Sequence, residues 1–243
     1  MNITQCTRYR VWDLPVRLFH WINFLSIFSL IAVALIMMYK QELGITGTDA
    51  KIGLKALHVT IGYVFVVNLI IRLAWGFFAS RYGRWGRILP GPGFMRSLRG
   101  YMTSVRNREP QQFLGHNPLG RLAVTAMLLL MLTLTVTGLI RAATDLYYPP
   151  FGTLAAHYVA EAGIDPTAIK PYDSVGTDPK RMAELKAFKG PFGQVHKYAA
   201  YTLMVIVLIH IIFVVRADAT EGGGIISAMF TGNKVTDKTP VDM

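Results

Sequence analysis

The sequence predicts an all-α membrane protein, a bundle of four transmembrane helices that forms a single domain over residues 1–243. Two observations predict this class. Of the residues, 52% are hydrophobic and only 16% are charged, and the hydrophobic ones gather in four long segments. A helix needs about 20 apolar residues to cross roughly 30 Å of hydrocarbon. Each segment is expected to be helical, because lipid offers no partners to unpaired backbone polar groups.

The four helices are expected at about residues 21–39, 58–78, 122–140 and 198–215. The first is interpreted as an uncleaved helix, because it ends in MMYKQEL rather than at a small-residue cleavage site. Asp13 is expected to cap this helix at its N-terminus. Asn117 and Pro118 have the residue types of a cap and first position for the third helix.

The distribution of arginines predicts the orientation. The loop 79–110 carries seven arginines against Glu109 alone, whereas the segment 141–193 has six basic and six acidic residues. The positive-inside rule therefore places the loop 79–110 and both termini in the cytoplasm, and the larger segment 141–193 in the periplasm. The net charge of +11 does not call for nucleic acid, because arginines that flank helices serve topology and bind anionic lipid headgroups. Membrane lipid is the expected partner of these charges.

The segment 141–193 is the one place where extramembrane structure is expected. The stretch DPKRMAELKAFKG is typical of a short helix that Asp178 caps, Pro179 begins and Gly190 ends. The stretch TLAAHYVAEAG, residues 153–163, is a second and weaker helix candidate.

Cys6 is the only cysteine of the sequence. The chain therefore cannot form an internal disulfide, a cysteine-ligated zinc or iron–sulfur centre, or a covalent C-x-x-C-H haem site by itself. Any redox metal has to be held by histidine or oxygen.

The histidines carry the chemical signal. Four of the six lie in predicted helices or their first turns, where an ionisable group is a functional hypothesis by default: His20, His58, His196 and His210. His196 and His210 are 14 residues apart, which is about 21 Å along a helix and about 40° short of four full turns. One helix thus offers an imidazole near each membrane surface, on nearly the same face. This geometry suits two stacked haems, one in each leaflet, and suits a single metal site badly.

Heights within the membrane predict the pairs of axial ligands. His20 and His210 both lie about 10 Å from the cytoplasmic side, and His58 lies near the outer end of its helix at the level of His196. Any other pairing would require one haem to be bound by histidines at opposite faces of the membrane. We therefore expect two haem b groups with bis-histidine ligation, an outer one at His58/His196 and an inner one at His20/His210.

Other residues fit the same arrangement. Gly62 and Gly138 would leave room for a flat macrocycle, and Arg72 lies 14 residues after His58, at the level of the inner haem. A buried arginine needs an anionic partner, which a haem propionate would supply to Arg72 and also to Arg17.

Each histidine also has a simpler interpretation. A single histidine at a helix end is more often an interfacial residue than a ligand, but two height-matched pairs outweigh that interpretation. His116 is either a loop histidine beside a helix cap or a residue that handles quinone or protons. His157 is expected at the surface.

Several motifs resemble those of a known group. LPVRLFHW, LHVTIGY, GHNPLGR and VHKY followed by LIHIIFVVRAD are similar to those of the four-helix bacterial di-haem b-type cytochromes. That group includes the b subunit of membrane-bound nickel–iron hydrogenases and the prokaryotic cytochrome b561 family. The resemblance implies a multi-pass protein of the bacterial inner membrane and axial ligation by His20, His58, His196 and His210. It also implies haem contacts by Arg17 and Arg72 and a quinone site near the inner haem.

Two features depart from the hydrogenase subunits. Those subunits often carry another histidine three residues before the ligand in the fourth helix, a position that Gly193 occupies here. The segment 141–193 is also longer than in the hydrogenase subunits. A periplasmic c-type cytochrome or another dehydrogenase is therefore as good a candidate partner as a hydrogenase.

The leading hypothesis is a transmembrane electron conduit between a periplasmic redox protein docked on residues 141–193 and the quinone pool of the respiratory chain. Since no substrate-oxidising centre can be built from these residues, we expect an electron-transfer subunit. The alternative is a stand-alone oxidoreductase whose outer haem reacts with superoxide or a ferric chelate, although the charge-neutral segment favours protein docking. A histidine-based transporter is a third hypothesis, but it gives no reason for the 14-residue spacings.

Overall fold

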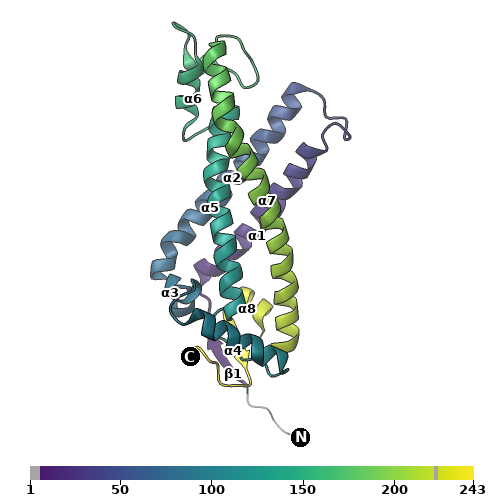
Figure 1. Cartoon of the computed structure of the whole chain (residues 1–243), viewed down its shortest axis with the longest axis vertical. Helices are drawn as coiled ribbons and strands as arrows, with labels where there is room; N and C mark the ends of the chain where they lie inside the picture. The colour runs from purple at the N-terminus through teal and green to yellow at the C-terminus, as the bar shows by residue number, and fades with distance from the viewer. Residues whose placement is uncertain (1–5, 222–223) are drawn as a thin grey trace. The chain divides into compact units, whose positions relative to one another are not determined.

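The computed structural model describes residues 6–221 and 224–243, and the chain is mostly helical (Figure 1). Four helices are long and apolar enough to cross a membrane: α1 (Leu14–Met38), α2 (Thr48–Phe78), α5 (Pro118–Leu146) and α7 (Pro179–Glu221). The predicted class, an all-α protein with four membrane-spanning helices, is confirmed. Four such helices are enough for a multi-pass membrane protein.

Shorter elements connect and flank these helices. They are β1 (Thr7–Arg10), η1 (Arg81–Gly83), α3 (Trp85–Ile88), α4 (Phe94–Arg106), α6 (Gly152–Val159), η2 (Pro166–Ala168), α8 (Ile225–Thr231) and β2 (Asn233–Thr236). The two strands pair antiparallel, with Thr7 opposite Thr236 and Arg10 opposite Asn233.

The long helices extend beyond the apolar segments of the sequence, because hydrophobicity marks only the part of a helix that lies in hydrocarbon. The expectation that Gly190 ends a short helix is wrong: α7 continues through Gly190 and Pro191. Proline removes one backbone N–H, and α7 tolerates this loss because the helix extends for many residues on both sides of Pro191.

The residues form two compact units, and each of the four long helices contributes to both. Unit 1 comprises Met1–Phe24, Val67–Leu129 and Leu203–Met243, and unit 2 comprises Leu25–Val66 and Leu130–Thr202. Histidines from two different long helices occur in each unit, namely His20 and His210 in unit 1 and His58 and His196 in unit 2.

Unit 1 has a small hydrophobic core in which residues near the N-terminus meet the segment after α2 and helix α8. Its buried residues are Val11, Trp12, Val16, Ala79, Tyr82, Leu114 and Ala228. Asp13 caps α1, as predicted, because its Oδ1 accepts a hydrogen bond from the Val16 N–H at 3.0 Å. Its Oδ2 accepts from the Ser80 N–H at 2.7 Å and from Trp75 Nε1 at 3.2 Å. Burial alone would raise the pKa of Asp13, but these hydrogen bonds outweigh it and hold the pKa below its usual value.

The start of α5 also follows the prediction. The Asn117 Oδ1 accepts a hydrogen bond from the Gly120 N–H at 2.8 Å, and Pro118 is the first helical residue. Pro118 suits this position because its missing N–H would have no partner in the first turn of a helix. His116 directly precedes this cap and therefore lies next to the N-terminus of α5.

In unit 2, helix α6 and the first part of α7 lie beside the end of α5 (Figure 1). Val159 of α6 and Leu185 of α7 form a buried cluster with Ala160 and Ile169 from the segment between these helices. Helix α6 confirms the weaker helix candidate of the sequence. Asp178 caps α7 as predicted, with its Oδ1 accepting from the N–H groups of Lys180 and Arg181 at 2.9 and 3.0 Å.

Candidate functional site

The imidazoles of His58 and His196 face each other in unit 2. His58 comes from α2 and His196 from α7, and their ring centroids are 6.4 Å apart with an angle of 71° between the planes. Two metal–nitrogen bonds of about 2 Å each, with the inner halves of both rings, span roughly 6 Å between centroids. The observed separation therefore fits two imidazoles that would hold one metal ion between them.

Thr137 of α5 orients the His196 ring. The Thr137 hydroxyl donates its one proton to the Thr133 carbonyl oxygen at 2.7 Å and lies 2.9 Å from His196 Nδ1. Since that proton is used, the hydroxyl accepts from an Nδ1–H, and Nε2 keeps the lone pair that a metal ligand needs. Sequence reasoning missed Thr137, because a threonine in an apolar helix carries no charge that would mark it.

The two predicted glycines differ in their surroundings. A Cβ on Gly138 would lie 3.3 Å from His196 Cε1, so the glycine allows α5 to approach the imidazole. A Cβ on Gly62, one turn after His58, would meet no heavy atom within 4 Å. Gly138 thus positions a ligand candidate, and Gly62 leaves open space beside α2.

A hollow of about 400 Å³ opens beside His196 in unit 2. It is lined by Arg141, Gly190, Gly193, Gln194, His196 and Lys197. The His58 Nδ1 is buried and has no hydrogen-bond partner within residues 6–221 and 224–243. The buried, unsatisfied histidine and the hollow are what a site built around a bound group would show.

In unit 1, His20 of α1 and His210 of α7 are close enough to interact electrostatically. The His20 ring packs edge-on against Trp21, with centroids 5.2 Å apart. Its Nδ1 is buried without a hydrogen-bond partner among the residues that the structure describes. The second predicted pair of histidines is therefore also gathered in one unit.

Arg72, which is buried, and Arg17, which is half-buried, are two cations of unit 1 that are fixed by backbone carbonyl oxygens. Arg72 is 5% exposed, donates from Nη2 to the Gly83 carbonyl oxygen at 3.0 Å, and stacks on Trp85. Arg17 donates from Nη1 to the Phe230 carbonyl oxygen. In the described part of the chain, Arg72 Nη1 and Arg17 Nε are buried without partners. A guanidinium keeps its charge in proteins, so both residues are suited to bind an anion.

His116 lines a separate pocket of about 200 Å³ in unit 1. Its ring packs against Trp12 with centroids 5.0 Å apart, and its Nδ1 is buried without a partner in the described residues. Burial lowers its pKa to about 3, and the positive charges of Lys234, Arg72 and Arg121 and the nearby His210 contribute. The imidazole is therefore neutral at physiological pH. His157 is exposed on α6, as predicted.

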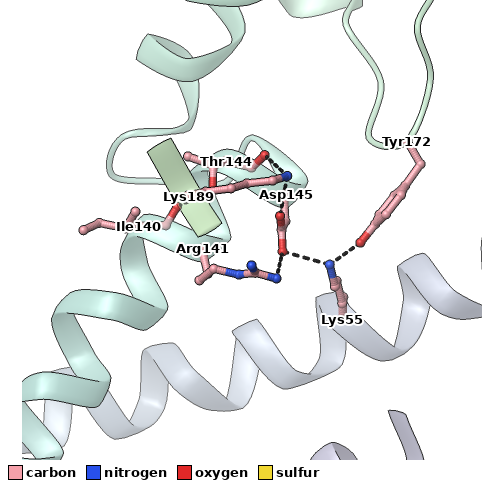
Figure 2. A network of polar contacts seen from close by, with 7 residues as sticks. All are labelled: Lys55, Ile140, Arg141, Thr144, Asp145, Tyr172 and Lys189. Carbon is pink, nitrogen blue, oxygen red and sulfur yellow. Dashed lines mark hydrogen bonds and ion pairs between the residues drawn. The ribbon is translucent and has the colours of Figure 1, made fainter. Parts of the chain in front are cut away.

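A polar network in unit 2 surrounds Asp145, near the end of α5 (Figure 2). Its carboxylate contacts three cations: Lys55 Nζ at 2.8 Å, Arg141 Nη2 at 2.6 Å and Lys189 Nζ at 2.7 Å. Lys55 also donates a hydrogen bond to the Tyr172 hydroxyl. The pair Arg141 and Asp145, four residues apart on one helix, was visible in the sequence, but the two lysines come from distant helices.

The fold and the site define a class: a membrane-spanning helix bundle that buries pairs of histidines suited to hold a metal cofactor. The family model described as prokaryotic cytochrome b561 matches residues 11–232. The chain belongs to this family. It is therefore a b-type cytochrome of the membrane, with haem b as its cofactor and electron transfer as its chemistry.

Relatives are found in several bacteria. The probable Ni/Fe-hydrogenase B-type cytochrome subunit of Bradyrhizobium diazoefficiens is 25% identical over 92% of this chain and 85% of the relative. The subunit of the same description from Rhizobium leguminosarum is 24% identical over 93% of this chain and 88% of its own length. The probable Ni/Fe-hydrogenase 1 B-type cytochrome subunit of Escherichia coli is 26% identical over 53% of this chain and 57% of the relative. No solved structure matches the chain.

The contact of Thr137 with His196 leads to a first prediction. The substitution Thr137→Val keeps the shape of the side chain but removes the acceptor for Nδ1–H, so the apoprotein is expected to bind haem b about 10-fold to 100-fold more weakly. A titration of the purified apoprotein with haem b measures this. The matched control is Thr144→Val, because Thr144 makes the same bond to the carbonyl four residues back, that of Ile140, but no contact with His196 is found for it. Equal binding by both variants and the wild type would contradict the prediction.

Proposed function

We propose that this cytochrome carries electrons across the bacterial inner membrane, between a redox protein in the periplasm and the quinone pool. The observation that carries the proposal is the placement of His196 and His210 fourteen residues apart on α7, in different units, each with a histidine of another helix in its own unit. Haem b at each pair supplies reversible one-electron chemistry when bound. The residues of the chain would bind and orient the two haems and neutralise the charges of their propionates.

In the proposed arrangement, His58 and His196 ligate the outer haem, and His20 and His210 ligate the inner one. The 6.4 Å between the centroids of His58 and His196 supports the outer pair. The buried, unpartnered nitrogen of His20 and its electrostatic interaction with His210 support the inner pair. Two glycines would leave room for the outer haem. Gly138 lets the His196 ring lie close to α5, and Gly62 faces open space.

Arg72 and Arg17 are proposed as the propionate partners of the inner haem. Each has a buried nitrogen without a partner in the described residues, and each is fixed by a hydrogen bond to a backbone carbonyl. Fixed guanidinium groups bind carboxylates with two parallel hydrogen bonds, which adds geometric selectivity to the attraction of opposite charges.

The proposed orientation has both termini in the cytoplasm. The seven arginines of residues 79–110 support it, and three of them lie on α4: Arg96, Arg99 and Arg106. Residues 79–110 belong to unit 1, whereas the charge-neutral residues 141–193 belong to unit 2. The positive-inside rule then assigns the His20/His210 level to the cytoplasmic side.

The pocket at His116 is the proposed site of quinone exchange. It lies in the unit of the inner pair, and His116 and His210 belong to the same unit. The neutral imidazole, with an unpartnered Nδ1, can hydrogen-bond a quinone oxygen, while Ser97, Arg87 and Arg121 supply further donors around the pocket. A proton taken up on quinone reduction would enter from the cytoplasmic side.

The partner is proposed to be a periplasmic redox protein that docks on residues 141–193. A nickel–iron hydrogenase is the first candidate, because relatives that align over most of this chain are described as hydrogenase cytochrome subunits. A c-type cytochrome and another dehydrogenase are the alternatives, because Gly193 and the long segment 141–193 depart from the hydrogenase pattern. Isolation of the native complex from membranes identifies which of the three is bound.

The function is tested by the oxidation of a short-chain quinol by the purified cytochrome, followed through the haem absorption bands. Quinol is expected to reduce the protein. The substitution His116→Phe keeps the aromatic packing on Trp12 but removes both nitrogens, so this reduction is expected to slow at least tenfold while the haem content stays at two. His157→Phe, at an exposed histidine, is the matched control. An unchanged rate in His116→Phe would exclude the pocket as the quinone site, and a wild-type protein that no quinol reduces would exclude the quinone-linked function.

A further inference from the structure

We propose that Arg141 binds a propionate group of the haem held by His58 and His196. This inference rests on the proposed function and deepens it, because it assigns an anion-binding residue to the outer site. Arg141 lies on α5 and lines the same hollow as His196, a ligand candidate on α7. Gln194 and Lys197 add two further polar side chains to the wall of this hollow.

The charge balance around Asp145 leaves room for an anion. Asp145 is the one carboxylate that contacts Lys55, Arg141 and Lys189 within residues 6–221 and 224–243, so the four side chains carry two net positive charges (Figure 2). The side chain of Asp145 is only 7% exposed, and those of the three cations are 22% to 33% exposed. Uncompensated charge is costly at such partly buried positions. The two carboxylates of haem b would neutralise it.

The guanidinium of Arg141 is held by Asp145 and fits against Gly193. Its Nη2 contacts Asp145 at 2.6 Å, and its Nη1 lies 2.6 Å from the position that a Cβ would occupy on Gly193. Only a glycine at position 193 leaves this space to Nη1. Gly193 also lines the hollow, so Nη1 lies at the wall of the hollow. Nη2 meanwhile stays paired with Asp145. A fork held in this way is suited to a carboxylate.

The alternative is that these cations bind an acidic surface of a docked protein instead of a haem propionate. The placement of Arg141 favours the propionate, because the residue shares its hollow with His196 instead of standing apart from the proposed ligands. Lys189, which pairs with the same carboxylate but does not line the hollow, serves as the matched control.

The experiment compares the binding of haem b and of its dimethyl ester, in which both propionates are uncharged, to the purified apoprotein. Arg141→Gln is expected to weaken one of the two haem b binding steps by roughly tenfold, and to leave the binding of the dimethyl ester unchanged. Lys189→Gln removes one charge of the cluster but no side chain that lines the hollow, so it is expected to weaken haem b binding less than Arg141→Gln does. Gly193→Ala keeps every charge but displaces Nη1, so it is expected to weaken haem b binding in the same direction and provides a second variant if Arg141→Gln does not fold.

Equal weakening for haem b and for the ester, or the same effect in Lys189→Gln, would overturn the assignment and leave Arg141 a structural residue. An unchanged haem affinity with weaker binding of a periplasmic partner would overturn it in favour of the docked acidic surface. Failure of the proposed function looks different, because no quinol would then reduce the wild-type protein, whatever haem affinity the Arg141 and Gly193 variants show.

Discussion

Replacement of His196 by alanine is expected to lower the haem b content of the purified protein from two to one per chain. The substitution removes one of the two imidazoles whose centroids lie 6.4 Å apart, and it also removes the ring that Thr137 orients. His58 would then be the one remaining ligand of this haem, and the apolar surroundings offer no other strong ligand to replace His196. The haem content is measured by pyridine haemochrome quantification against protein concentration.

The same variant tests the proposed pairing. A redox titration of His196→Ala is expected to lose one of two steps, and His58→Ala is expected to lose the same step. His157→Ala is the control, because His157 is exposed on α6, and it should keep two haems and both steps. If His196→Ala and His210→Ala lost the same step instead, the assignment of one haem to each unit would be wrong.

The substitution Asp145→Asn is expected to lower the free energy of unfolding by about 2 kcal/mol. The change leaves Lys55, Arg141 and Lys189 without the carboxylate that contacts all three of them at 2.6 to 2.8 Å. Breaking a fully buried ion pair costs about 3–5 kcal/mol and exposed pairs contribute about 1 kcal/mol or less; because these cations are partly exposed, the estimate lies between. The network joins α2, α5, α7 and the loop of Tyr172, so its loss affects several elements of unit 2 (Figure 2).

Denaturant unfolding of the purified apoprotein in detergent measures this effect. Glu161→Gln, at an exposed carboxylate of the same unit, is the control and is expected to change the stability by less than about 0.5 kcal/mol. Equal stabilities of the two variants would mean that the contacts of Asp145 contribute no more than exposed ion pairs do.

The fold class could be predicted from the sequence because lipid leaves a long apolar segment few alternatives to a helix. Caps were also predictable, since Asp13, Asn117 and Asp178 each supply an oxygen to N–H groups that the first turn leaves unpaired. The end assigned to Gly190 was wrong for a physical reason. A glycine followed by a proline usually ends a soluble helix, but α7 continues through both into the membrane-spanning segment.

The candidate site was predictable where an ionisable group in a membrane segment marked it. His58 and His196 stood out in this way, and the structure brings their rings together from two helices. Thr137 could not be predicted, because a threonine in an apolar helix usually bonds to its own backbone and carries no sign of a second contact. The approach of Arg141 to Gly193 could not be predicted either, because it depends on how α5 and α7 pack within unit 2.

The central claim is that this chain holds one haem b at each of its two histidine pairs. Pyridine haemochrome quantification of the purified wild-type protein, expressed with haem available and shown to be folded, tests it most directly. The predicted result is two haems b per chain, with two one-electron steps in a redox titration. One haem per chain, or none, would contradict the claim.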